Sequence, residues 1–335
     1  MVRKLSPKKT TRRTSPPGFL RAAAVVAFSA VVGFGDAQAA PEGESSQTTP
    51  EPVLDMRYAQ VEKVQLVMIP AGVTDKKGRP VAGLTAGDFS LTVDGEPKAI
   101  EFFATESNAP VALAFLLDLS GSMRQPGKLD AAKEAIHSLV DILDAEDQFG
   151  LIGFADNQVT WITEFTSDAA TFKKRLDVQT GYGQTALYDA LAASPRLVDE
   201  QLQTRKAIIL FTDGLDNASG MPPLQAVQVA RQVSVPIYAV NFLQAAPEML
   251  STESREALLL LARFCRETGG QLITIQKPVE LAAAMAGIQN DLRLQYVLGF
   301  QQEADNGSEG FRRIRLATNR SRLSVRCRSG YYPGF

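Results

Sequence analysis

The middle of the chain repeats one pattern, in which a short apolar run is followed by a segment with helical spacing. The first run, 111–117, is seven consecutive apolar residues and is typical of a strand buried on both faces. In the segment after it, apolar residues recur three or four positions apart and predict a helix over 128–143. Further strands are predicted at 149–154, 207–212, 237–242 and 272–275, and further helices at 169–176, 186–199, 223–233, 253–268 and 280–293. This alternation indicates an α/β domain over 109–293, with a Rossmann-like, doubly wound and mainly parallel sheet.

The two flanks of that domain have the patterns of β-structure. The first flank, 59–108, contains three candidate strands and the dipeptide Asp94-Gly95, which is a hairpin signal. The second flank, 294–335, contains three more candidate strands. Neither flank is long enough to build a core of its own. We therefore predict that both flanks form one small β-sandwich into which the α/β domain is inserted, with two separate β-ribbons as the alternative.

The first 58 residues resemble an export signal and a linker. Residues 1–21 are basic, residues 22–34 are apolar, and Ala37-Gln38-Ala39 has the small-x-small pattern of a cleavage site. This combination predicts a secretory signal peptide over 1–39, because the apolar run is shorter than the ~20 residues that span a bilayer. The Pro-, Glu- and Ser-rich segment 40–58 is expected to be a flexible leader. The protein is thus expected in the periplasm or outside the cell, with no transmembrane segment after cleavage.

Charge and composition exclude several classes of protein. The chain has 35 Lys and Arg against 37 Asp and Glu, and residues 1–39 hold seven of the basic residues and one acid. The remainder therefore has 28 basic and 36 acidic residues, a net charge of −8. Such an acidic chain is poorly suited to nucleic acids, whose binding depends on neutralising phosphates. Two cysteines and one histidine also argue against a disulfide scaffold, a His-rich zinc site and a His-based catalytic triad.

Oxygen-bearing side chains gather in three short segments that follow predicted strands or open a predicted helix. The segments are Asp118-Leu-Ser-Gly-Ser122, Gly183-Gln-Thr185 and Thr212-Asp213-Gly214. Loops at the carboxyl ends of strands in an open α/β sheet converge at the point where the strand order reverses. Each segment alone is also compatible with a helix cap or a turn. Together they predict a surface-loop site for a hard cation, Mg²⁺ or otherwise Mn²⁺ or Ca²⁺, with the candidate ligands Asp118, Ser120, Ser122, Thr185 and Asp213.

At these residues the sequence resembles the von Willebrand factor type A (VWA) domain and its metal-ion-dependent adhesion site (MIDAS). The resemblance implies that Ser120, Ser122 and Thr185 ligate the cation directly. It also implies that Asp118 and Asp213 act largely through coordinated waters, and that an acidic residue of a partner completes the shell. The flanks, through the segments 73–81, 84–89 and 330–333, are similar to exported bacterial VWA proteins described especially from acidobacteria. This second resemblance implies architecture and export, and no mechanism.

Two weaker signals lie outside the oxygen-rich loops. Cys265 and Cys327 alternate with apolar residues and are expected to be buried as small hydrophobic side chains, with a disulfide between them left open. The stretch from Arg312 to Arg328 contains seven arginines and no acid. A solvated sheet face is the favoured interpretation, and a patch for an anionic partner is the alternative.

The sequence favours a non-catalytic binding protein that recognises an acidic group on a protein or surface polymer through its cation. The alternative is a structural or assembly protein of the cell envelope in which the metal only stabilises the fold. A metal-assisted hydrolase is the least favoured interpretation, because P-loop and GxSxG motifs are absent and the oxygen-rich loops hold no histidine.

Overall fold

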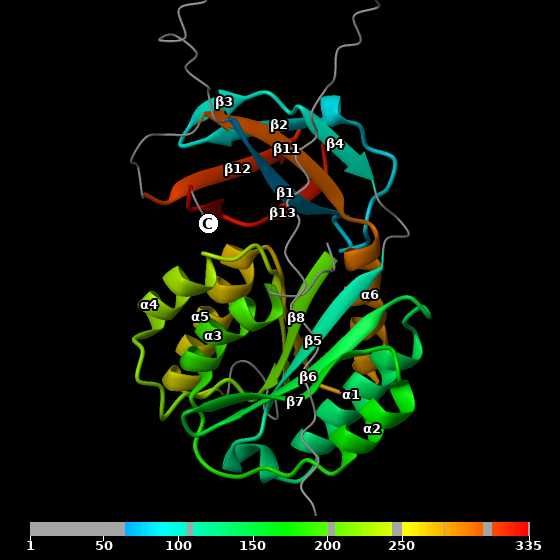
Figure 1. Ribbon diagram of the computed structural model, residues 1–335, viewed down its shortest axis with the longest axis vertical. Coiled ribbons are helices and arrows are strands. Elements are labelled where there is room, and N and C mark those ends of the chain that lie inside the picture. Colours follow the sequence, from blue (N-terminus) through cyan, green and yellow to red (C-terminus); the bar gives the residue numbers. More distant parts are fainter. Residues whose placement is uncertain are drawn as a thin grey trace, which may run out of the picture. The chain divides into compact units, whose positions relative to one another are not determined.

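A computed structural model describes residues 64–105, 110–199, 205–242, 250–277, 279–303 and 310–333. The predicted signal peptide and leader lie outside these ranges, and their assignment stays a prediction. In the described part of the chain, the named strands form one six-stranded sheet and two four-stranded sheets. The six-stranded sheet belongs to the predicted α/β domain, and the other two belong to the flanks (Figure 1).

The central sheet is doubly wound, as predicted. Its strands lie in the order β10-β9-β8-β5-β6-β7, and only β7 runs antiparallel to its neighbour. Their bounds are β5 (Val111–Asp118), β6 (Gln148–Ala155), β7 (Gln158–Thr166), β8 (Arg205–Thr212), β9 (Ile237–Phe242) and β10 (Leu272–Ile275). After β5 the chain first builds β6 and β7 on one side, and then β8 to β10 on the other. The strand order therefore reverses between β5 and β8, which is where such sheets bind ligands.

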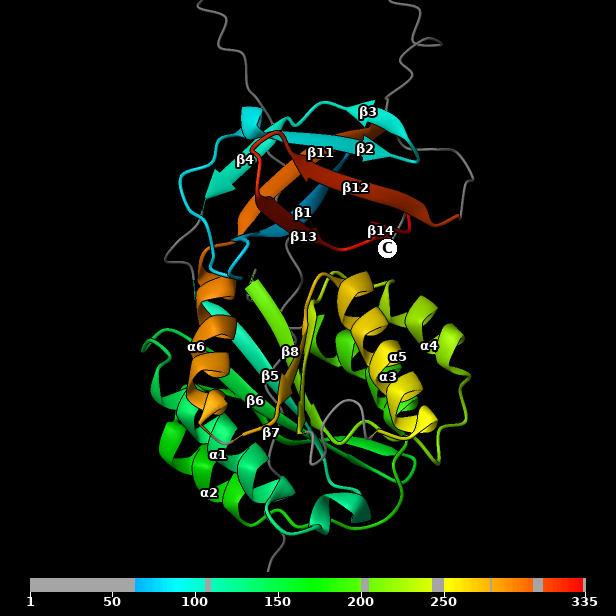
Figure 2. The same cartoon turned by 180° about the vertical axis from the view of Figure 1, so that it is seen from behind.

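Six helices of the described chain cover the two faces of this sheet. They are α1 (Lys128–Asp141), α2 (Ala169–Asp177), α3 (Leu187–Asp199), α4 (Pro223–Ala230), α5 (Thr252–Thr268) and α6 (Glu280–Arg293). Figures 1 and 2 show α1, α2 and α6 on one face and α3, α4 and α5 on the other. Side chains of β5 alternate between these layers, since Phe115 and Leu117 pack with the first set and Ala114 and Leu116 with the second. Both faces of β5 are buried, which explains its unbroken apolar run.

Strand β7 was not predicted from the sequence. It pairs antiparallel with β6 at the edge of the sheet, and most of its residues are half-buried or exposed. Its apolar residues are interrupted by polar ones, and no more than two of them, Trp161 and Ile162, are consecutive. An edge strand covered on part of its surface does not need the continuous apolar run that marks β5.

The flanks build one β-sandwich, which confirms that prediction over the alternative of two ribbons. One sheet has the order β13-β1-β11-β4 and the other has the order β14-β12-β2-β3, so each contains strands from both ends of the chain. Strands of the first flank are β1 (Val64–Asp75), β2 (Phe89–Val93), β3 (Glu96–Lys98) and β4 (Phe102–Thr105). Strands of the second are β11 (Tyr296–Glu303), β12 (Arg312–Thr318), β13 (Leu323–Cys327) and β14 (Gly330–Tyr331). A shared core that includes Ile69, Leu91, Leu298 and Ile314 lies between them.

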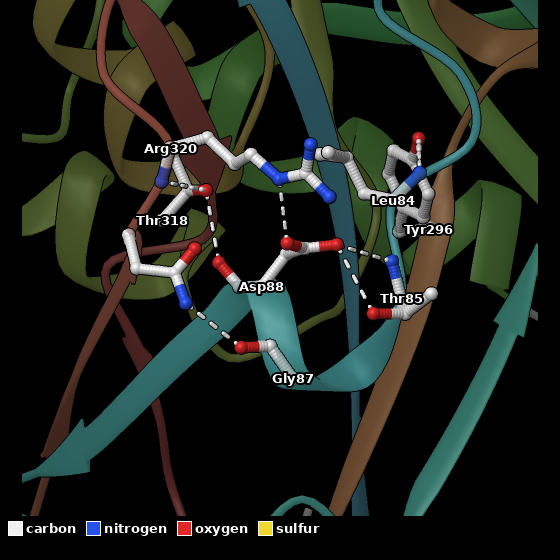
Figure 3. A network of polar contacts seen from close by, with 8 residues as sticks. Leu84, Thr85, Gly87, Asp88, Tyr296, Thr318 and Arg320 are labelled. Atoms are coloured by element: carbon white, nitrogen blue, oxygen red, sulfur yellow. Dashed lines mark hydrogen bonds and ion pairs between the residues drawn. The ribbon is translucent and has the colours of Figure 1, made fainter.

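A polar network around Asp88 ties the two flanks together (Figure 3). One oxygen of the Asp88 carboxylate accepts a hydrogen bond from the Thr85 backbone NH at 2.8 Å, and the other accepts one from Nε of Arg320 at 2.7 Å. The Thr318 hydroxyl donates to the Asp88 carbonyl oxygen at 2.9 Å. The Arg320 guanidinium and the Thr85 donors lower the pKa of Asp88 to about 2. Thr85 and Asp88 belong to the first flank, whereas Thr318 and Arg320 belong to the second.

Two arginines of the second flank connect the sandwich to the α/β domain. Arg326 on β13 forms an ion pair with Asp291 on α6, and the hydroxyl of Tyr238 on β9 donates to the same carboxylate. Arg328 donates to the Ser234 hydroxyl and to the Met68 carbonyl oxygen. The expectation of a solvated arginine face was therefore wrong for these two residues. Their outward alternation is real, but α/β-domain residues meet them there.

Both cysteines are free, and Cys265 is buried whereas Cys327 is half-buried. Burial raises the pKa of the Cys265 thiol to about 12 and that of Cys327 to about 11. Cys265 packs on the inner face of α5, and Cys327 packs against the sandwich core, as expected of small hydrophobic side chains. Among the helices that the structure describes, none is long and apolar enough to cross a membrane.

Candidate functional site

The predicted oxygen ligands lie at the reversal point of the central sheet. Asp118 is the last residue of β5, and Asp213 directly follows β8, the neighbouring parallel strand. The remaining candidates lie on the segment after β5 and on the segment that leads into α3. The topology of the doubly wound sheet thus gathers segments that are far apart in sequence.

Asp118 is fully buried, so its expected place in a surface loop was wrong. One of its carboxylate oxygens accepts a hydrogen bond from the Ser120 backbone NH at 2.8 Å. The other accepts one from the Thr212 hydroxyl at 2.7 Å. Burial, with a smaller contribution from the nearby Asp213 carboxylate, raises the pKa of Asp118 to about 6. The hydrogen bonds from Ser120 and Thr212 act in the opposite direction and lower it. Thr212 belongs to the predicted segment Thr212-Asp213-Gly214, but its role as a donor to Asp118 was not predicted.

The segment after Asp118 forms a short 3₁₀ turn, Gly121–Arg124, that presents two hydroxyls side by side. The Oγ atoms of Ser120 and Ser122 lie 3.0 Å apart. The backbone NH of Gly121 donates to the carbonyl oxygen of Gly183 at 2.9 Å, which joins this turn to the segment that carries Thr185. Gly183 has φ +65°, and a Cβ there would come within 2.4 Å of the Asp156 carboxylate. Glycine is therefore required at 183 by its positive φ and by the close approach of Asp156 from the turn between β6 and β7.

Thr185 is held by the segment that follows β8. Its carbonyl oxygen accepts hydrogen bonds from the backbone NH groups of Asn217 and Ala218 at 3.0 and 3.1 Å. Its own NH donates to the side-chain oxygen of Asn217 at 2.8 Å. Thr185 is buried, and these three hydrogen bonds fix its backbone. Asn217 is a positioning residue that the sequence did not single out, because an asparagine in a polar loop is ordinarily interpreted as a turn former.

Asp213 forms a buried ion pair that was also missed from the sequence. The Lys128 ammonium lies 2.8 Å from Oδ2 of Asp213, and the two side chains are 10% and 6% exposed. The other oxygen, Oδ1, is buried and has no hydrogen-bond partner within the described ranges. Lys128 is the first residue of α1, where the helix dipole disfavours a cation. The ion pair with Asp213 offsets this unfavourable position of the lysine.

Hydrogen bonds and strand pairing therefore bring all three predicted segments together, and four of the five candidates are buried or nearly so. Within the described ranges no cluster of three or more His, Cys, Asp or Glu side chains has the arrangement of a metal site. The present site has two carboxylates, and hydroxyls supply its other oxygens. The buried, unpartnered Oδ1 of Asp213 is the feature that fits a cation, since a buried acceptor without a donor is costly.

Residues 113–215, which include all five candidates, match the sequence profile of the von Willebrand factor type A domain. The chain therefore contains a VWA domain. Among curated relatives, the bovine inter-alpha-trypsin inhibitor heavy chain H4 is 28% identical over 149 residues, covering 40% of this chain and 16% of that protein. A UPF0353 protein of Mycobacterium sp. (strain KMS) is 24% identical over 267 residues, covering 73% of this chain and 78% of that protein. The chain thus spans only a small part of the heavy chain and most of the mycobacterial protein.

Solved structures include proximal thread matrix protein 1 from the mussel byssus, in a form whose MIDAS motif is occupied by zinc. It is 20% identical to this VWA-domain protein, with a TM-score of 0.47, and the match covers 60% of this chain and 50% of that one.

Proposed function

We propose that this VWA-domain protein is an exported, non-catalytic binding protein that recognises an acidic group on a partner through a divalent cation. The observation that carries the proposal is the buried oxygen cluster with the unpartnered Oδ1 of Asp213. In this proposal Ser120, Ser122 and Thr185 ligate the cation directly. Asp118 and Asp213 act largely through waters. Hard oxygens favour Mg²⁺, with Mn²⁺ or Ca²⁺ as substitutes.

The charges of the site favour an anionic partner. With both carboxylates ionised, Asp118 and Asp213 balance a 2+ ion, and the Lys128 ammonium adds one positive charge. The loaded site would then carry one net positive charge in a buried setting, where charge interactions are stronger than in water. A carboxylate from outside the chain neutralises that charge and supplies a further ligand.

The rim of the site favours a protein as the partner. Tyr182 and Leu215 belong to two of the loops that carry the site, and they are 49% and 37% exposed. Arg124, on the turn after Ser122, is also exposed, and its guanidinium has no partner in the described chain. An aromatic ring, an aliphatic side chain and a guanidinium are side-chain types that protein interfaces use. A free carboxylate-bearing small molecule would leave them unused.

A binding role fits the residues better than catalysis. A metal-assisted hydrolase needs a general base within reach of the activated water. The single histidine, His137, lies on α1, outside the oxygen-rich loops. Its Nε2 forms a hydrogen bond with Oδ1 of Asp177 at 2.7 Å. The structural alternative, in which the cation only stabilises the envelope protein, differs from the binding role in a measurable way. It requires no capture of an acidic partner.

Calorimetric titration of Mg²⁺ and Mn²⁺ into the metal-stripped protein tests the cation site. We expect saturable binding that Asp213→Asn reduces by about tenfold or more, because that change removes a carboxylate aimed at the ion. Asp130→Asn is the matched control, since Asp130 is exposed in the first turn of α1 and loses the same charge nearby. Equal loss in both variants would show only a general charge effect, and no binding by the parent at millimolar Mg²⁺ would contradict the site.

Selection of a random peptide library on the Mg²⁺-loaded protein tests the partner class. We expect enriched peptides to contain Asp or Glu, to be released by EDTA and to be lost with Asp213→Asn. Peptides enriched without acidic residues would contradict the proposed recognition. If metal binds and no acidic peptide is enriched, the structural alternative is favoured.

A further inference from the structure

The structure divides the seven arginines between Arg312 and Arg328 into two groups. Four of them are engaged within the chain through the ion pairs and hydrogen bonds of Arg312, Arg320, Arg326 and Arg328. The guanidinium groups of Arg313, Arg315 and Arg322 are exposed and make no hydrogen bond or ion pair with any described part of the protein. The arginine-rich stretch is therefore partly structural, and only its second group is free to meet another molecule.

Arg313 and Arg315 point from the same face of β12. The residues between and after them, Ile314 and Leu316, are buried in the sandwich core, so both arginines lie on the outer face of the sheet. Side chains two residues apart on a strand are separated by about 6.8 Å. Arg315 is also paired in register with Thr92 on β2, which adds a hydroxyl to that face.

These side chains line an open cleft of about 650 Å³. Its lining consists of Thr92, Asp94, Gly95, Phe311, Arg313 and Arg315. The single acid, Asp94, is already engaged, because its carboxylate pairs with Arg312 at 3.2 Å and accepts the Arg313 backbone NH at 2.8 Å. The charges of Arg313 and Arg315 therefore remain uncompensated inside the cleft.

One lining residue of the cleft, Phe311, has an aromatic ring that is held in place. The ring of Phe311 covers Gly330, where a Cβ would come within 2.4 Å of it. The same ring packs edge-on against Tyr332 at 5.2 Å, and Arg231 lies over it at 4.7 Å. The cleft thus combines two free guanidinium groups, one hydroxyl and one fixed ring.

We propose that this cleft, on the outer face of the sheet β14-β12-β2-β3, binds an acidic polysaccharide. Each guanidinium can form paired hydrogen bonds with a carboxylate or sulfate group, and their spacing along β12 suits a chain with repeated anionic groups. Thr92 and Phe311 offer a hydrogen bond and an apolar surface to the sugar rings between those groups.

Other polyanions fit the cleft less well. A peptide that extends a sheet needs an open strand edge, whereas the edge of β12 at Arg312 and Arg313 is already paired with β14. Binding to anionic lipid headgroups typically uses clusters of about four to eight basic residues, and this cleft has two. Nucleic-acid binding depends on neutralising many phosphates, and this cleft offers two guanidinium groups.

The test is titration of the whole protein with polygalacturonate at low salt, with and without EDTA. We expect binding that weakens as salt rises, persists in EDTA and falls by about tenfold or more in Arg313→Ser/Arg315→Ser. Arg322→Ser is the matched control, because Arg322 is exposed and free but lies outside the cleft, and we expect its affinity to stay within about twofold. The thermal transition of each variant checks that the sandwich remains folded.

Three outcomes would overturn this proposal. They are no binding by the parent protein, equal binding by the double variant, and tighter binding of polyglutamate or phosphatidylglycerol vesicles than of polygalacturonate. Loss of binding in EDTA would assign the polymer to the cation site instead. Because the cleft and the cation site share no residue, either proposal can fail without the other.

Discussion

At the scale of single residues, Asp118 makes a testable link between pH and stability. Its pKa is raised from 3.8 to about 6 in the fold, mainly by burial. Asp118 therefore binds its proton more tightly in the folded, metal-free protein than in the unfolded chain. The free energy of unfolding falls as pH rises from about 4 through 6. The shift corresponds to a cost on the order of 3 kcal/mol above that range.

We expect Asp118→Asn to remove this cost, because an amide of the same shape stays neutral. In EDTA at pH 8, urea denaturation should show the variant to be more stable than the parent by up to ~3 kcal/mol. The two proteins should converge below about pH 4, where the parent's Asp118 is protonated in both states. A variant less stable than its parent at pH 8 would show that the hydrogen bonds to Ser120 and Thr212 outweigh the cost of burying the charge.

Some residues of the site can be predicted from the sequence, and others cannot. The candidates Asp118, Ser120 and Ser122 are close neighbours in the chain, so their spacing is visible without a structure. Lys128 and Asn217 act on residues 85 and 32 positions away, and nothing in their local sequence names those partners. Only the fold brings them into contact.

At the scale of elements, one glycine is required by a close approach, and another can be replaced. A Cβ at Gly270, between α5 and β10, would lie 1.9 Å from the carbonyl oxygen of Ile237 on β9. We expect Gly270→Ala to destabilise the protein by about 1–3 kcal/mol or more, because backbone must move. Gly287 lies on α6 with nothing within 4 Å of an added Cβ, so Gly287→Ala should stabilise by about 0.5–1 kcal/mol. Urea midpoints compare the two variants, and equal effects would contradict both the tight contact at Gly270 and the open space at Gly287.

The helices were predicted from their spacing, whereas the prediction of a strand depended on how completely it is buried. All six predicted helices exist, and the predicted bounds of α6, 280–293, agree with the structure. The strand β5 was visible because both of its faces are covered. The edge strand β7 was missed because one-sided, partial burial leaves a mixed sequence that resembles a polar loop.

At the scale of the whole molecule, the sequence indicated which segments form the sandwich but not how it joins the α/β domain. Patterns of alternation can place Arg326 on the outward face of β13, since its neighbours Val325 and Cys327 pack toward the core. They cannot show that α6 supplies Asp291 to that face. This contact joins segments that lie on opposite sides of the predicted domain boundary at residue 293.

The last prediction concerns the ion pair between Arg326 and Asp291. Arg326 is the main positive charge facing the buried Asp291 carboxylate. Arg326→Met would leave the carboxylate with the Tyr238 hydroxyl as its remaining donor and with an uncompensated charge. Removing one partner of a buried ion pair costs about 3–5 kcal/mol, and the partial exposure of Arg326 places this case near ~3 kcal/mol. We expect a lower thermal transition and faster amide hydrogen exchange in α6, measured beside Arg322→Met as the control for losing one arginine. If exchange in α6 is unchanged while the transition falls, the loss comes from the hydrogen bonds of Arg326 to Gly269 and Gln271, and the ion pair with Asp291 does not stabilise α6.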